Sequence, residues 1–152
     1  MLYRLIIFVL LTALLAPAQI TQRSKPIPRN RSVKAKSNME LSRLVASLRA
    51  QGARIALTNE KVSQPFFSRA GRVMTVNGEG VQVFEYSHAL AADKEAKLVS
   101  SDGMRIGTTK PSWMAPPHFF QSGRLIVLYV GNEQTIVRIL EGAIGRQFAG
   151  IE

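Results

Sequence analysis

Apolar residues recur at the spacing of a helix face in three segments, residues 37–52, 87–99 and 132–145. Positions three, four and seven residues apart share one side of an α-helix, so each stripe predicts a helix packed against a core. A serine or asparagine of N-cap type precedes each stripe, and Gly52 and Gly145 end the first and third. The predicted buried stripes are Leu41, Leu44, Val45 and Leu48; Ala89, Ala92, Ala96 and Val99; and Ile136, Ile139, Leu140, Ala143 and Ile144.

Shorter apolar runs favour extended structure between these helices. The pair Asn77-Gly78 separates two of the runs, and it predicts a tight hairpin because both of its positions favour positive φ. The run after this turn is apolar on both faces, which places it inside a sheet. Residues 59–71 and 110–121 contain prolines and aromatic side chains and are predicted to be irregular. The predicted strands are residues 53–57, 73–76, 81–86, 104–107 and 125–130, of which the last is the most apolar and is expected to be central.

The order of these elements indicates an α+β fold. Hairpins combined with helical crossovers favour a layered structure, in which helices cover an antiparallel sheet. We therefore predict a single small domain over residues 37–152, with a four- to five-stranded, mostly antiparallel sheet and three helices mainly on one face.

The N-terminus has the layout of a secretory signal peptide over residues 1–18. Arg4 precedes an apolar run, and Ala16 and Ala18 supply small residues at the positions that a signal peptidase reads. Cleavage there would place the mature protein outside the cytoplasm, in the periplasm or secreted. An uncleaved anchor in the membrane is the alternative, because the charge after the run exceeds the charge before it. The run is short for an anchor, at about 21 Å of helix against roughly 30 Å of hydrocarbon.

Most of the positive charge lies directly after this segment. The chain has a formal net charge of +10, and residues 19–36 contain six cations and no acid. This stretch is predicted to be a disordered tether, either a solvated spacer or an attachment to an anionic membrane or wall surface. No aromatic side chain interrupts the cations, so nucleic acid is not the expected partner. The cations are Arg23, Lys25, Arg29, Arg31, Lys34 and Lys36.

One segment carries candidate binding chemistry. Trp113, His118, Phe119 and Phe120 lie close together among prolines, and they are predicted either to line a pocket for a small apolar ligand or to fill the core. His118 has no Asp, Ser or Cys neighbour, and no nucleophile-elbow motif occurs in the chain. With no cysteine present, thiol catalysis and Cys-ligated zinc are excluded. We predict no catalytic residue, no metal site and no cofactor, and interpret His88 as a surface residue.

Seven segments of the predicted domain form a distinctive pattern. They are QPFFS at 64–68, VNGEGVQVFEY at 76–86, SDG at 101–103, IGT at 106–108, Trp113, PPHFF at 116–120 and GRLIVLYVG at 123–131. Together they resemble a group of small bacterial exported proteins and lipoproteins that have no assigned activity. The resemblance covers about residues 41–150 and implies a bacterial envelope location, without a catalytic residue to transfer. Gln19 follows Ala18 where the lipoproteins require a cysteine, so lipid anchoring by that route is excluded.

Three functions remain open at this point. The first is a non-enzymatic envelope protein that binds a partner protein or a small ligand. The second is a binder of small apolar ligands with a pocket around Trp113, Phe119 and Phe120. The third is an enzyme that uses His118 and a distant acid. A membrane-anchored form with its N-terminal helix retained is a further alternative to the exported protein.

Overall fold

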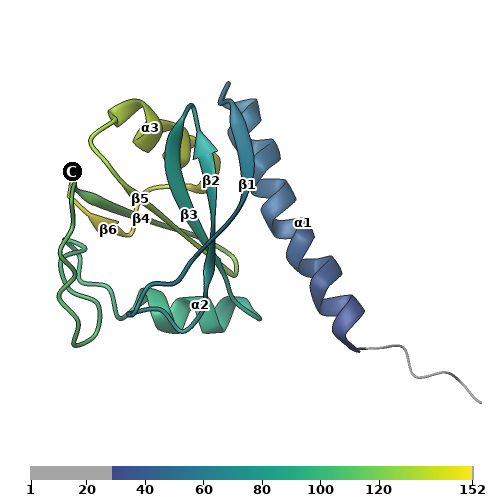
Figure 1. Cartoon of the computed structure of the whole chain (residues 1–152), viewed down its shortest axis with the longest axis horizontal. Coiled ribbons are helices and arrows are strands. Elements are labelled where there is room, and N and C mark those ends of the chain that lie inside the picture. Colours follow the sequence, from purple (N-terminus) through teal and green to yellow (C-terminus); the bar gives the residue numbers. More distant parts are fainter. Residues whose placement is uncertain (1–28, 152) are drawn as a thin grey trace, which may run out of the picture.

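Within residues 29–151, six antiparallel strands form one sheet, accompanied by three helices (Figure 1). The structure is a computed structural model that describes residues 29–151, and for residues 29–38 it describes the backbone alone. The predicted signal peptide, Arg23 and Lys25 lie outside the described residues. The elements are α1 (Arg29–Ala50), β1 (Ile55–Val62), β2 (Gly71–Val76), β3 (Glu79–Glu85), α2 (Ala89–Ala96), β4 (Pro117–Ser122), β5 (Leu125–Val130), α3 (Gln134–Ile144) and β6 (Ala149–Gly150).

The strand order in the sheet is β1-β2-β3-β5-β4-β6, and every pairing is antiparallel. The predicted hairpin joins β2 to β3, with positive φ at both Asn77 (54°) and Gly78 (97°). β3 and β5 lie next to each other inside the sheet, as their apolar character predicts. The α+β class is therefore confirmed, but the predicted count of four to five strands is too low.

Two strands were missed, β4 in a segment that was predicted to be irregular and β6 near the end of the chain. β4 starts at Pro117, and a proline at the first position of a strand removes no ladder hydrogen bond that the strand needs. The first four residues of β4 are all buried, so the strand shows no alternation of apolar and polar positions. β6 has two residues, too few for any pattern. The predicted strand at residues 104–107 is instead a pair of isolated bridges at Ile106.

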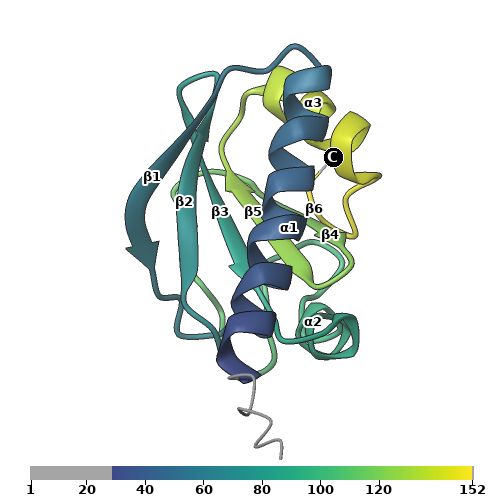
Figure 2. The same ribbon diagram turned by 90° about the vertical axis from the view of Figure 1, so that its right-hand side faces the viewer.

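Both faces of the sheet are covered. In β5, Leu125, Val127 and Tyr129 pack with α1 and α3, whereas Ile126 and Leu128 pack with α2 and the adjoining loops. Figures 1 and 2 show α1 and α3 side by side, with α2 separate from them. The prediction that the helices lie mainly on one face is therefore corrected to two helices on one face and one on the other. The physical reason is that neither face of β5 is polar enough to remain in water.

Helix α1 begins earlier than its apolar stripe predicts. Its backbone is helical from Arg29, eight residues before Ser37, so it includes the second half of the predicted tether. Figure 1 shows the first turns of α1 extending away from the sheet. Among residues 29–151, no helix combines the length and apolarity needed to cross a bilayer.

Candidate functional site

The four predicted ligand-binding residues do not line one pocket. Phe119 and Phe120 have no exposed surface, and their side chains belong to opposite faces of the sheet. This separation follows from strand geometry, because successive side chains point to opposite faces. Phe120 packs beneath α1 and α3, whereas Phe119 packs with Trp113 on the face of α2. Phe119 and Phe120 thus fill the two cores, while Trp113 and His118 reach two separate pockets.

Trp113 is held by an aromatic cluster and one hydrogen bond. Its ring meets Phe66 and Phe119 edge-on, with centroid distances of 5.7 and 6.0 Å. Its indole Nε1 donates to the carbonyl oxygen of Gly103 at 3.0 Å. The loop that supplies this carbonyl is braced by Asp102, whose carboxylate accepts hydrogen bonds from the Ser100 hydroxyl and a backbone amide. These bonds, the one from Ser100 foremost, lower the pKa of Asp102.

Beside Trp113 lies an apolar groove of about 510 Å³. Met114 projects from it with a fully exposed side chain, although large apolar side chains usually find cover. A hydrogen bond of 2.9 Å between Gln64 and Gln82 joins two of the lining residues. No lining residue is charged, in contrast with the basic composition of the chain. The groove is lined by Gln64, Pro65, Phe66, Gln82, Thr109, Pro111, Ser112, Trp113, Met114, Ala115 and Val130.

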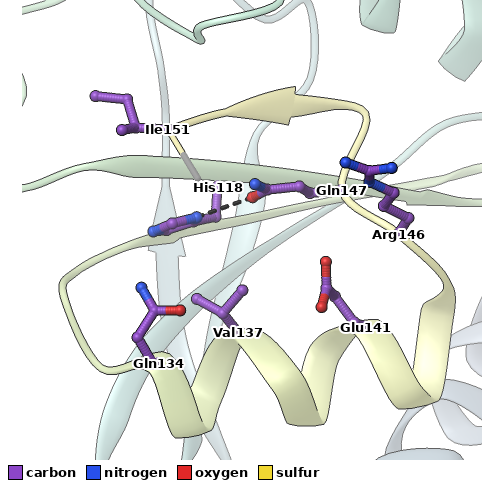
Figure 3. A pocket seen from close by; sticks show the side chains of 7 residues that line it. All are labelled: His118, Gln134, Val137, Glu141, Arg146, Gln147 and Ile151. Atoms are coloured by element: carbon purple, nitrogen blue, oxygen red, sulfur yellow. Dashed lines mark hydrogen bonds between the residues drawn. The ribbon is translucent and has the colours of Figure 1, made fainter.

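His118 borders a second pocket, of about 520 Å³, between α3 and the residues around β6 (Figure 3). Its ring is 2% exposed and stacks on Tyr129 at a centroid distance of 5.8 Å. Nε2 donates to the Gly131 carbonyl at 3.2 Å, because a carbonyl can only accept. Nδ1 lies 2.9 Å from Oε1 of Gln147, as the dashed line in Figure 3 marks. The amide of Gln147 can present either an oxygen or an NH₂ group to this nitrogen.

These contacts give His118 a structural role. Both ring nitrogens are occupied, by an amide and a main-chain carbonyl, and neither contacts a carboxylate or hydroxyl of the kind that forms a catalytic relay. His88 is the N-cap of α2, because its Nδ1 accepts a hydrogen bond from the Ala91 N–H at 3.1 Å. The cap is thus one residue later than the serine that the sequence predicts.

A buried arginine in the turn just before β5 was missed by sequence reasoning. Arg124 is 6% exposed, and its guanidinium pairs with Glu85 at 2.6 Å and with Glu40 of α1 at 3.3 Å. Its NH1 donates to the carbonyls of Tyr86 and Ser87, each at 3.4 Å. A single side chain therefore ties α1 to the end of β3 and to the following turn. No local signal marks it, because its acidic partners lie 84 and 39 residues away.

The described part of the chain, residues 29–151, contains no group of three or more His, Asp or Glu side chains placed to hold a metal ion. Comparisons with protein-family models, curated protein sequences and solved structures gave no match to this chain.

Proposed function

We propose that this protein is an exported, non-enzymatic binding module of the bacterial envelope, and that the groove beside Trp113 is its binding surface. The layout of residues 1–18 and the resemblance to small exported proteins support the location. The observation that carries the binding role is Met114, a fully exposed methionine beside a partly buried tryptophan in an apolar groove. Met114 is continuous with Pro65, Phe66 and Trp113 in this groove, and an apolar patch that remains exposed is typical of an interaction site.

The occupant that we propose is an uncharged apolar segment of a partner protein. The groove offers Pro65, Phe66, Trp113 and Met114 to apolar side chains, and methionine adapts its shape to different partners. Polar groups of Gln64 and other lining residues can bond a partner backbone. Since no lining residue is charged, nothing there offsets the desolvation of a charged segment.

Fluorescence of Trp113 tests this proposal, because it is the only tryptophan in the chain. A blocked, uncharged peptide that contains leucine and proline is titrated into the purified full chain, and the emission is expected to shift to shorter wavelength. Met114→Ser is expected to weaken binding at least fivefold. Leu57→Ser is the matched control, since Leu57 is 59% exposed on β1, away from the groove.

Equal binding by the wild type, Met114→Ser and Leu57→Ser would refute the groove as the binding surface. Binding of a small apolar probe such as anilinonaphthalene sulfonate, without binding of peptide, would favour the alternative of a small-ligand binder. In that case the pocket consists of Trp113 and Met114 rather than Trp113, Phe119 and Phe120.

Export has its own test. N-terminal sequencing of the protein from a bacterial envelope fraction is expected to begin at Gln19. Recovery of the whole chain in the membrane fraction, with Met1 retained, would establish the uncleaved anchor instead.

Attachment through the cationic segment is a further part of the proposal. Because α1 begins at Arg29, deletion of residues 19–36 would remove part of a helix. Replacing the cations by glutamine keeps the helical residues and removes the charge. Salt-sensitive binding to anionic vesicles is expected to be lost in this variant, and unchanged binding would leave the segment as a spacer. The replaced residues are Arg23, Lys25, Arg29, Arg31, Lys34 and Lys36.

A further inference from the structure

Helix α2 packs on the sheet with one side and leaves the other side in solvent. Ala92 and Ala96 are its buried residues. Positions three and four residues apart share one side of a helix, and four such positions opposite these alanines are all exposed. Lys97 and Leu98 follow α2 but continue its last turn, since their amides donate to carbonyl oxygens of the helix. We call this side the α2 outer face, and it consists of Leu90, Lys94, Lys97 and Leu98.

The α2 outer face combines two apolar side chains with two positive charges. Leu90 is 60% exposed and Leu98 is 49% exposed, and both lysines lie between them in the sequence. The two acids of α2 are turned to other elements. Asp93 accepts a hydrogen bond from a side chain of β4, and Glu95 accepts one from the loop before β2. The face itself is therefore cationic, with leucine at each end.

The position of α2 relates this face to the cationic segment. Figures 1 and 2, which differ by a quarter turn, both show α2 at the end of the molecule where α1 begins. A flat anionic surface that attracts the first turns of α1 would therefore also come close to α2. In sequence, these first turns contain Arg29, Arg31, Lys34 and Lys36.

We infer that the α2 outer face docks onto an anionic phospholipid bilayer, as a second contact beside the cationic segment. The leucines of an amphipathic helix enter the boundary between headgroups and acyl chains, while the lysines reach the phosphates. A soluble polyanion or a wall polymer offers no apolar phase to the leucines. A protein partner would need a groove that matches a convex helix, whereas a fluid bilayer adapts to its shape.

Two leucines and two lysines on a short helix bind weakly alone, so the face acts on a domain that is already held near the bilayer. A first attachment raises the effective concentration of the second contact. The inference rests on the attachment proposed for the cationic segment and does not depend on the Trp113 groove. Contact at both places would fix the orientation of the domain on the membrane.

Sedimentation of the purified full chain with vesicles that contain phosphatidylglycerol tests the face, and phosphatidylcholine vesicles are the uncharged reference. Leu90→Ser combined with Leu98→Ser is expected to weaken binding about fivefold or more, because an apolar contact is lost. Lys94→Gln combined with Lys97→Gln is expected to weaken it about tenfold or more at low salt, since each lysine near such a surface contributes about fivefold.

Strand β1 supplies the matched controls. Leu57→Ser replaces a leucine that is 59% exposed, as much as the leucines of the α2 outer face. Arg54→Gln combined with Lys61→Gln removes two exposed cations, one just before β1 and one within it. Both controls are expected to bind vesicles within about twofold of the wild type, because these residues lie outside α2.

A single label reads the contact directly, because the chain contains no cysteine. Leu90→Cys is labelled with nitrobenzoxadiazole, whose emission is expected to move to shorter wavelength when phosphatidylglycerol vesicles are added. The same label at Leu57→Cys is expected to keep its emission unchanged. A shift that persists when the six cations of residues 19–36 are replaced by glutamine would support the α2 outer face and refute attachment through the segment.

Three results would overturn the inference. Vesicle binding by the wild type without a shift at Leu90→Cys would leave the cationic segment as the contact and remove α2 from it. Equal losses in the α2 lysine variant and in the β1 cation control would show general attraction to a basic protein. Absence of any binding to the anionic vesicles would refute both contacts together.

Discussion

Arg124 ties α1 to the sheet, and loss of its side chain should weaken this attachment. Arg124→Met keeps most of the side-chain volume but removes the guanidinium. Glu40 and Glu85 then lose their cation, and two carbonyls lose a donor. The carboxylates remain in place with side-chain exposures of 33% and 19%, so water only partly replaces the lost contacts.

The magnitude follows from this partial exposure. Removing one partner of a fully buried ion pair lowers the free energy of unfolding by about 3–5 kcal/mol. Because the two carboxylates here are partly solvated, the expected loss for Arg124→Met is smaller, about 2–3 kcal/mol. For a fold of about 120 residues, the unfolding entropy is about 0.25 kcal/mol per kelvin. The melting temperature of Arg124→Met should therefore fall by about 8–12 °C.

Calorimetry and urea denaturation measure this loss, with Arg54→Met as the control on an exposed arginine. The control should change stability by less than about 0.5 kcal/mol. Adding Glu40→Gln and Glu85→Gln to Arg124→Met should recover at least half of the loss, because neutral amides do not leave a charge unpaired. The reasoning fails if Arg124→Met melts within about 1 °C of its control, or if the triple variant is no more stable than Arg124→Met.

Two further predictions concern the cores and the buried tyrosines. Phe119→Leu and Phe120→Leu should each lower the free energy of unfolding, measured by urea denaturation, by about 1–2 kcal/mol. In the double variant the two losses should add within about 0.5 kcal/mol, because the rings belong to separate cores. Strong coupling between the two substitutions would contradict this separation. Burial raises the pKa of both Tyr86 and Tyr129 in the folded state, so the unfolded chain loses these protons first. The contribution of these two tyrosines to stability should therefore be constant below pH about 10 and fall above it, less steeply in Tyr86→Phe. A stability that rises above pH about 10 would show the opposite sign.

The elements that could be predicted from the sequence are those with a local pattern. The Asn77-Gly78 pair specifies a hairpin because its two positions adopt positive φ, as they do in the structure. The apolar stripes mark α1 and α3, and Gly145 ends α3 as expected. β5 is recognisable because six consecutive apolar residues have to be buried on both faces.

The elements that were missed have no such pattern. β4 is buried on both faces but contains Pro117 and His118, so its sequence resembles a loop. Its place in the sheet comes from pairing with β5, in the register that sets Phe119 opposite Leu128. β6 exists because Gly150 allows its backbone to approach Pro117 closely, where a Cβ would lie 2.4 Å from the carbonyl oxygen.

The candidate sites were predictable only in part. The sequence points to Trp113 as a site residue, and the structure places this residue at the groove. It gives no indication that Phe119 and Phe120 belong to different cores, because that depends on whether their segment is a strand. The role of Arg124 was not found, since a charged side chain shows its burial only through distant neighbours.

Turns, helix stripes and the most apolar strand follow from interactions between residues that are near in the chain, and the order of amino acids specifies them directly. The division of the helices between two faces, the Arg124 clamp and the pocket beside His118 arise when segments up to 84 residues apart meet. Burial is a property of the packed chain as a whole, so whether a side chain fills a core, holds a helix in place or faces a ligand depends on that packing.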